Sequence, residues 1–142
     1  MKILLIAAPR PDSDGTAMHM GDGRPPMGLA YISAYVEDFG HETKIIDLYH
    51  FGGGHKDEQA GAEHSSATIS HIVRNDKPFD IFGTIENYKP DFIGMYLGTI
   101  SFYEGTDLAL QIKNLYPNIP IMVGGPHAIE LPETLTPYFD FV

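Results

Sequence analysis

The fold class of this chain is decided by the stretch Met122-Val123-Gly124-Gly125-Pro126-His127-Ala128. An apolar run at 119–123 leads directly into two glycines, a proline and a histidine. A short, continuously apolar run is typical of a parallel strand, and open α/β sheets bind ligands where such strands end. Glycine there removes the side chain that keeps a ligand away from the backbone. A tight turn between strand and helix explains a Gly-Gly pair equally well, so the stretch predicts a strand end and leaves the ligand site open.

Working outward from this stretch, strand-like and helix-like segments alternate along the chain. Apolar runs occur at 3–7, 43–46, 92–97, 119–123 and 139–142, and helical periodicity at 27–39, 79–88 and 103–115. This alternation is the signature of βα units. We therefore predict an α/β fold of the Rossmann-like or flavodoxin-like type, a doubly wound, five-stranded parallel sheet with helices on both faces. The inward side of the first helix is predicted to consist of Leu29, Ile32, Val36 and Phe39.

The composition excludes several classes of function. Among 142 residues there is no cysteine, so no disulfide, thiolate metal site or iron–sulfur cluster lies within this segment. A net charge of −10, from 19 acidic and 9 basic residues, disfavours binding to phosphate backbones, and we expect no nucleic-acid or membrane partner. The apolar run at 3–7 is too short for a signal peptide or a membrane span, so we expect a cytoplasmic location.

Two long connections, at 9–26 and about 48–67, follow the first two predicted strands. Loops of this length are either functional or disordered. The second contains His50, His55 and His64, but their spacing fits no helical zinc pair, and we interpret them as solvated. The segment 1–142 is expected to be a single domain. Because a covering helix normally follows the last strand of such a sheet, we expect it to be part of a longer chain.

The familiar chemistries of α/β folds are not indicated. No phosphate-binding loop or dinucleotide fingerprint is present. The aspartate that a phosphorelay receiver places after its third strand is replaced by Leu97-Gly98-Thr99, and no serine lies on a nucleophile elbow. We predict no catalytic residue in this segment and no metal ligand.

Four segments instead carry a family resemblance. They are Pro25-Pro26-Met27-Gly28 before the first helix, Gly40-His41-Glu42 with Asp47 around the second strand, Lys89-Pro90-Asp91 before the third, and Gly124-Gly125-Pro126-His127-Ala128 with Pro132-Glu133 after the fourth. In this order and at these intervals, they resemble the cobalamin (B12)-binding domain at the N-terminus of B12-dependent radical SAM enzymes. The resemblance covers nearly the whole chain.

The resemblance implies cobalamin as the cofactor. It also implies a C-terminal radical SAM domain in the parent chain, with a [4Fe–4S] cluster and S-adenosylmethionine, and a methyltransferase or cyclase reaction. The cofactor-binding residues that it implies are Pro9, Met27, Gly28, Leu97, Gly98, Thr99, Ser101, Gly124, Gly125, Pro126 and His127.

The chain also departs from related corrinoid domains. It lacks the D-x-H-x-x-G motif that supplies a cobalt ligand, and Asp14 and His19 do not reproduce its spacing. The resemblance therefore implies cobalamin bound with its base off and no protein histidine on cobalt. Tyr96 stands where those domains place a serine and is expected to narrow the channel for the nucleotide tail. The alternatives are a domain of this fold without cobalamin and a Rossmann-like lobe such as the N-terminal half of a nucleotide-sugar transferase.

Overall fold

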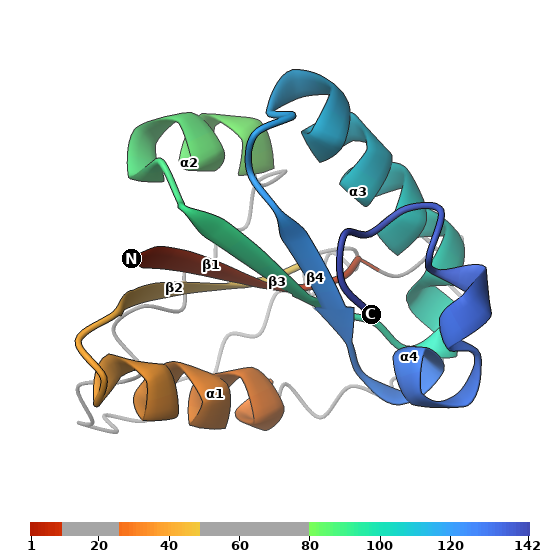
Figure 1. Ribbon diagram of the computed structural model, residues 1–142, viewed down its shortest axis with the longest axis horizontal. Coiled ribbons are helices and arrows are strands. Elements are labelled where there is room, and N and C mark those ends of the chain that lie inside the picture. Colours follow the sequence, from red (N-terminus) through yellow and green to blue (C-terminus); the bar gives the residue numbers. More distant parts are fainter. Residues whose placement is uncertain (10–25, 49–79) are drawn as a thin grey trace, which may run out of the picture.

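The computed structural model describes residues 1–9, 26–48 and 80–142 (Figure 1). Their strands are β1 (Lys2–Ala7), β2 (Glu42–Asp47), β3 (Phe92–Tyr96) and β4 (Ile121–Gly124), and their helices are α1 (Met27–Glu37), α2 (Ile81–Tyr88), α3 (Phe102–Leu115) and α4 (Pro126–Glu130). The strands form one parallel sheet in the order β2-β1-β3-β4. The predicted α/β class and parallel sheet are thus confirmed.

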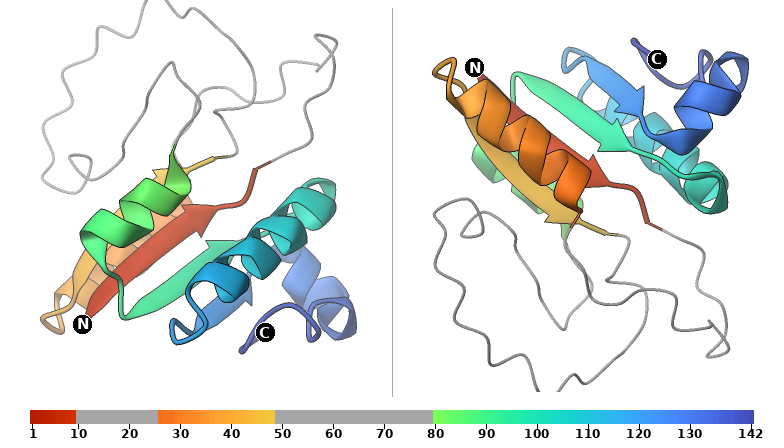
Figure 2. Two further views of the ribbon diagram at one scale, coloured as in Figure 1. Left: turned by 90° about the horizontal axis from the view of Figure 1, so that it is seen from above. Right: turned by 90° about the horizontal axis from the view of Figure 1, so that it is seen from below.

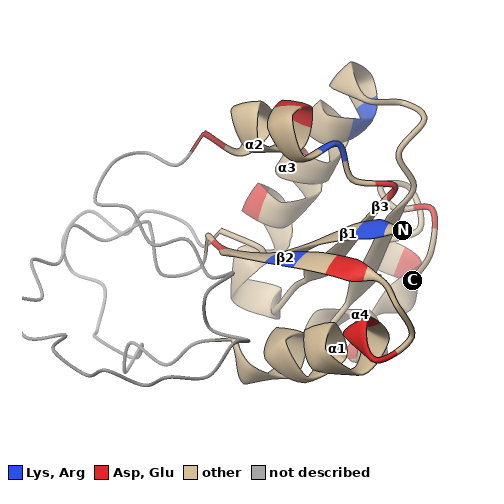
Figure 3. Cartoon of the chain, turned by 90° about the vertical axis from the view of Figure 1, so that its left-hand side faces the viewer, with Lys and Arg blue, Asp and Glu red and all other residues tan. Residues whose placement is uncertain are grey.

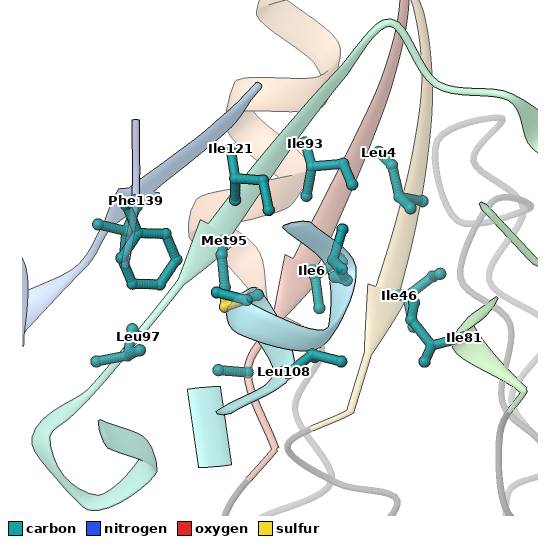
Figure 4. Packing of buried hydrophobic residues seen from close by; sticks show 14 of the residues in the cluster. Leu4, Ile6, Ile46, Ile81, Ile93, Met95, Leu97, Leu108, Ile121 and Phe139 are labelled. Carbon is teal, nitrogen blue, oxygen red and sulfur yellow. The ribbon is translucent and has the colours of Figure 1, made fainter. Parts of the chain in front are cut away.

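Helices cover both faces of the sheet, with α1 on one side and α2 and α3 on the other (Figures 1 and 2). Side chains of β1 alternate between these faces, as the pleat of a strand requires. Leu4 and Ile6 point into the larger core under α2 and α3, and Ile3 and Leu5 into the smaller one under α1. Figure 4 shows the larger core, in which Ile93, Met95, Ile121 and Phe139 also lie. Burial on both faces explains why β1 is apolar from Ile3 to Ala7.

Helix α1 buries only part of the predicted side: Leu29 and Val36 face the smaller core as expected. Leu29 and Ser33 are buried, whereas Ile32 and Phe39 are 50% and 65% exposed, so the expectation that these two face inward is wrong. The hydroxyl groups of Ser33 and Thr43 form a buried hydrogen bond between α1 and β2. Because a buried hydroxyl needs a partner, this pair favours the observed side of a helix that is apolar nearly all round.

The segment 139–142 runs beside β4, but the described residues form a sheet of four strands, and the predicted fifth strand is not confirmed. Its one ladder contact is a parallel bridge between Met122 and Phe141. The carboxylate of Asp140 accepts the N–H of Ile121 at 2.8 Å, and the N–H of Asp140 donates to the Ile121 carbonyl at 2.9 Å. The Asp140 carboxylate thereby accepts the N–H that a backbone carbonyl accepts in a regular pair of strands.

Candidate functional site

In the strand order β2-β1-β3-β4, the next strand along the chain after β1 lies on one side, as β2, and the next strand after β3 lies on the other side, as β4. Adjacent parallel strands whose connections diverge leave an opening at their carboxyl ends, which is where open α/β sheets bind ligands. The N–H of Ala8 donates to the carbonyl of Tyr96 at 2.9 Å and keeps the two strands paired up to this edge. We call the strand ends at residues 7–8 and 96–98 the switch point.

Gly98 and Gly124 lie at the ends of β3 and β4 and border open space. A Cβ atom added at either glycine would meet nothing within 4 Å, and the same holds for Gly28 in the first turn of α1. Gly98 has an extended backbone, with φ −94° and ψ 163°, that any residue adopts. The fold itself therefore does not require glycine at 98, and the space beside it is available to a ligand.

Gly125 has a different role from its neighbour Gly124. Its φ is +108°, and an added Cβ would lie 2.7 Å from the carbonyl oxygen of Leu97. Only glycine adopts this conformation without strain. Pro126 follows as the first residue of α4, where its missing N–H costs no hydrogen bond. The Gly-Gly pair thus combines both explanations open at the sequence level, because Gly125 makes the turn and Gly124 leaves room.

His127 is buried, with 4% of its surface exposed, and both ring nitrogens have a partner. Nε2 lies 3.0 Å from Thr134 Oγ1, and Nδ1 lies 3.2 Å from Thr99 Oγ1. The Thr134 hydroxyl donates its proton to the carbonyl of Leu131 at 2.7 Å and so accepts from Nε2–H. Nδ1 is left to accept from the Thr99 hydroxyl. The ring also packs against Phe102 at 4.8 Å between centroids, so His127 holds the connections after β3 and β4 together.

The first turn of α3 carries two polar oxygens that are buried without a hydrogen-bond partner in the described part of the chain, Ser101 Oγ and Glu104 Oε2. Ser101 is a predicted site residue. Glu104 is not, although the spacing Ser-x-x-Glu at a helix start is a recognisable signal. Unpaired buried polar atoms are uncommon in folded proteins, so this turn is a candidate for binding a ligand group.

Tyr96 ends β3 in a row of paired residues that also contains Ala7 and Gly124. Its side chain is 39% exposed and lies next to Gly125, where an added Cβ would come within 3.1 Å of the Tyr96 ring. Small residues on both neighbouring strands leave this ring as the bulkiest group of the row. That the Tyr96 ring narrows the channel for the nucleotide tail stays a prediction.

A comparison with protein-family models now adds to this geometry: the model of the B12-binding domain matches residues 19–142. The chain belongs to the B12-binding domain family. The sequence-based expectation of a cobalamin-binding-like domain is confirmed at this level, and the four-stranded parallel sheet with its open carboxyl edge is the structural counterpart of the match.

Two relatives of this B12-binding domain are named methyltransferases. It is 32% identical over 133 residues to an uncharacterized methyltransferase of Pyrococcus horikoshii, a match that covers 94% of the chain and 23% of the relative. The chain is 27% identical over 109 residues to the cytidylyl-2-hydroxyethylphosphonate methyltransferase of Streptomyces wedmorensis. This match covers 76% of the chain and 19% of the relative. The chain thus spans less than a quarter of either relative. No solved structure matches it.

The remaining predicted site residues of the B12-binding domain, Pro9 and Met27, lie at the same edge. Pro9 follows β1, and Met27 is 53% exposed at the start of α1, near the carboxyl end of β1 (Figure 2). The predictions for Asp14, His19 and the loop histidines at 50, 55 and 64 fall outside the described ranges.

The charge distribution of the described residues fits a ligand with an uncharged polar rim. Their lysines, Lys2, Lys44, Lys89 and Lys113, lie away from the carboxyl ends of the strands (Figure 3). Within the described ranges, no three acidic or histidine side chains are grouped to hold a metal ion, and no helix has the length and apolarity to cross a membrane. The open glycines and the unpaired oxygens of α3 therefore lie at an edge of the sheet from which the described lysines are absent.

Proposed function

We propose that this B12-binding domain holds cobalamin across the carboxyl edge of its sheet, over the switch point. The observation that carries the proposal is the open space beside Gly98 and Gly124. A corrin ring is broad and nearly flat, so it needs low walls where it crosses strand ends, and glycine provides the lowest wall. The family match supports cobalamin as the ligand that uses this space.

In this arrangement Pro9, Met27 and Gly28 border the corrin from the first connection, and Leu97 to Ser101 border it from the third. His127, itself a predicted cofactor-binding residue, fixes Thr99, whose oxygen keeps lone pairs for an amide N–H. Bound there, cobalamin supplies a cobalt centre suited to one-carbon transfer. The residues of this chain bind and orient the cofactor.

The test is a visible-spectrum titration of the purified chain with hydroxocobalamin. We expect saturable binding, and Gly98→Leu and Gly124→Leu should each weaken it at least about tenfold because their side chains fill the ligand space. A matched control, Ala34→Leu on the exposed side of α1, should bind like the wild type. Absence of binding by the wild type, or equal binding by both glycine variants, contradicts the proposal.

We propose further that cobalamin is bound with its base off and without a histidine on cobalt. Support comes from His127, whose two ring nitrogens are both engaged, and from His41, which precedes β2 at the opposite edge of the sheet. Nitrogen ligation splits the EPR lines of cob(II)alamin. We expect no such splitting in the complex and the same spectrum for His19→Ala; a nitrogen splitting lost in His19→Ala shows that the first connection supplies a ligand.

The parent protein, we propose, is a B12-dependent radical SAM enzyme of the methyltransferase or cyclase type. Two observations support a further domain: the chain spans less than a quarter of its methyltransferase relatives, and α1 exposes an aromatic outer side. Tyr31, Tyr35 and Phe39 are 72%, 66% and 65% exposed, which is typical of a helix that another domain covers. Determination of the gene sequence beyond residue 142 tests this, because a radical SAM domain requires a C-x-x-x-C-x-x-C motif that binds [4Fe–4S].

The nucleotide-sugar transferase alternative is not favoured. The family match and both methyltransferase relatives point to the cobalamin class. Titration with a nucleotide sugar in place of hydroxocobalamin discriminates the two functions. A cobalamin-binding domain should bind only hydroxocobalamin, and a nucleotide-sugar transferase lobe should bind only the nucleotide sugar.

A further inference from the structure

The first turn of α3 contains an unformed capping motif. Ser101 is the N-cap residue and Glu104 follows three positions later, the Ser-x-x-Glu spacing in which each side chain normally bonds the other residue's backbone N–H. Here the Ser101 side chain makes no capping bond. Its own N–H donates instead to the carbonyl of Gly98 at 2.9 Å, so Glu104 has no N-cap donor to accept from.

Both side chains consequently keep free hydrogen-bonding capacity in a buried place. Ser101 is 1% exposed, and neither its Oγ nor Oε2 of Glu104 has a partner in the described residues. A helix start that already contains suitable groups normally uses them for its own N–H groups. The two oxygens therefore keep hydrogen-bonding capacity that the described residues do not use.

The turn lies against the switch point. Gly105, the next residue of the helix, is so close to the strand ends that an added Cβ would lie 2.5 Å from Leu97 Cδ1 and 3.2 Å from Ala8 Cβ. This places the start of α3 directly over the ends of β1 and β3. Ser101 lies one helical turn before Gly105, and Glu104 directly precedes it, so both residues belong to the turn that packs at this edge.

The two groups select a particular ligand chemistry. A carboxylate only accepts hydrogen bonds, whereas a hydroxyl both donates and accepts. Together they match a primary carboxamide, whose N–H₂ donates to the carboxylate and whose carbonyl accepts from the hydroxyl. A phosphate or carboxylate group is disfavoured, because Glu104 repels it and the described lysines lie away from this edge.

We propose that Ser101 and Glu104 together bind one of the three longer side-chain carboxamides on the rim of the corrin, the propionamides b, d and e. The amide N–H donates to Glu104 Oε2, and the Ser101 hydroxyl donates to the amide carbonyl. This assignment rests on the proposed cobalamin function. It adds a pair of residues that determines the orientation of the corrin, because the rim amides differ in position and only one of them reaches this turn.

The test uses cyanocobalamin and its b-, d- and e-monocarboxylic acids, in each of which one rim carboxamide is replaced by a carboxylate. For the wild-type chain, calorimetric titration should show one isomer bound about tenfold more weakly than cyanocobalamin, since a carboxylate loses the donor and faces Glu104. In Glu104→Gln that penalty should disappear, because the glutamine amide donates to the carboxylate. The matched control Asp107→Asn, on the exposed side of the same helix, should retain it.

A second readout examines the free protein. Ser101→Ala should weaken cyanocobalamin binding and leave the melting temperature of the unliganded chain unchanged or raised, since the hydroxyl has no partner there. A lowered melting temperature shows that the hydroxyl is bonded within the fold and overturns the assignment. Equal binding of all three isomers by the wild type, or a penalty that persists in Glu104→Gln, also overturns it while leaving cobalamin binding intact. Absence of cyanocobalamin binding by the wild type instead rejects the proposed function, and the assignment with it.

Discussion

His127 Nδ1 lies 3.2 Å from Thr99 Oγ1, although 28 residues separate the two in the sequence. The hydrogen bond joins the connection after β3 to the connection after β4, and the second ring nitrogen extends it to Thr134. Each connection borders the open space at Gly98 or Gly124. One buried imidazole, together with the backbone hydrogen bond from the Leu97 N–H to the Gly124 carbonyl, thus joins the two walls of the proposed cofactor site.

Replacement of this imidazole by a ring without nitrogens isolates the hydrogen bonds from the packing. His127→Phe keeps a ring against Phe102 but removes both bonds and leaves the Thr99 hydroxyl without its partner. We expect a loss of about 1–3 kcal/mol in the free energy of unfolding, measured by urea denaturation, and weaker cobalamin binding. The control His41→Phe, outside the site, should change stability by less than about 0.5 kcal/mol. Wild-type stability in His127→Phe would show that the two bonds contribute nothing net.

The adjacent glycines of the central turn provide a matched pair of substitutions. Gly125→Ala should destabilise the chain by about 1–3 kcal/mol, because φ is +108° and the new Cβ would lie 2.7 Å from the Leu97 carbonyl oxygen. Gly124→Ala should change stability by no more than about 0.5 kcal/mol, since its Cβ meets nothing within 4 Å. Chemical denaturation of both variants measures the difference. Equal stabilities would refute the division of roles between the two positions.

The sequence pattern predicts the sheet well and the helix orientation poorly, for a physical reason. β1 is buried on both faces and is apolar from Ile3 to Ala7. β3 and β4 are also apolar runs, although Tyr96 and Met122 are exposed, so these strands stand out without any knowledge of their neighbours. Helix α1 is apolar on almost every side, so its period does not select between Ile32 and Ser33 as the inward residue. The choice depends on Thr43, which lies on another element.

The site shows the same limit. Motif resemblance identifies Gly124, Gly125 and His127, but only backbone angles and contacts distinguish a turn glycine from an open one. The role of Glu104 follows from an absent hydrogen bond, which no spacing reveals. The sequence therefore locates the edge of the sheet at which the proposed site lies. The three-dimensional contacts indicate what each residue of that edge does in the proposed site.

Tyr96 provides a test of ligand shape. Its exposed ring ends β3 between the small residues Ala7 and Gly124, so Tyr96→Ser should open the space beside the strand ends. We expect the affinity for cobalamin relative to cobinamide, which lacks the nucleotide tail, to rise about tenfold in this variant. Tyr96→Phe keeps the ring and should leave the ratio unchanged. A ratio equal in Tyr96→Ser and the wild type would show that the tyrosine does not restrict the tail.

Asp140 links the last segment of the chain to β4 and makes stability depend on pH. The hydrogen bond from Lys113 Nζ, at 2.7 Å, and the N–H of Ile121 hold the pKa of this carboxyl below its usual value of 3.8. A group whose pKa is lower in the folded state stabilises the fold above its unfolded pKa and loses that contribution as the pH falls through the folded pKa. The effect is modest because both side chains of the ion pair are partly exposed, at 31% and 36%.

Asp140→Asn should therefore be less stable than the wild type at pH 7, and the difference should shrink steadily below about pH 4. Urea denaturation at a series of pH values measures the two free energies of unfolding. Lys113→Gln removes the first donor but keeps the Ile121 N–H, so it should reduce the pH-dependent difference without abolishing it. A difference between Asp140→Asn and the wild type that is the same at pH 7 and pH 3 would show that the ionised carboxylate does not hold this segment against β4.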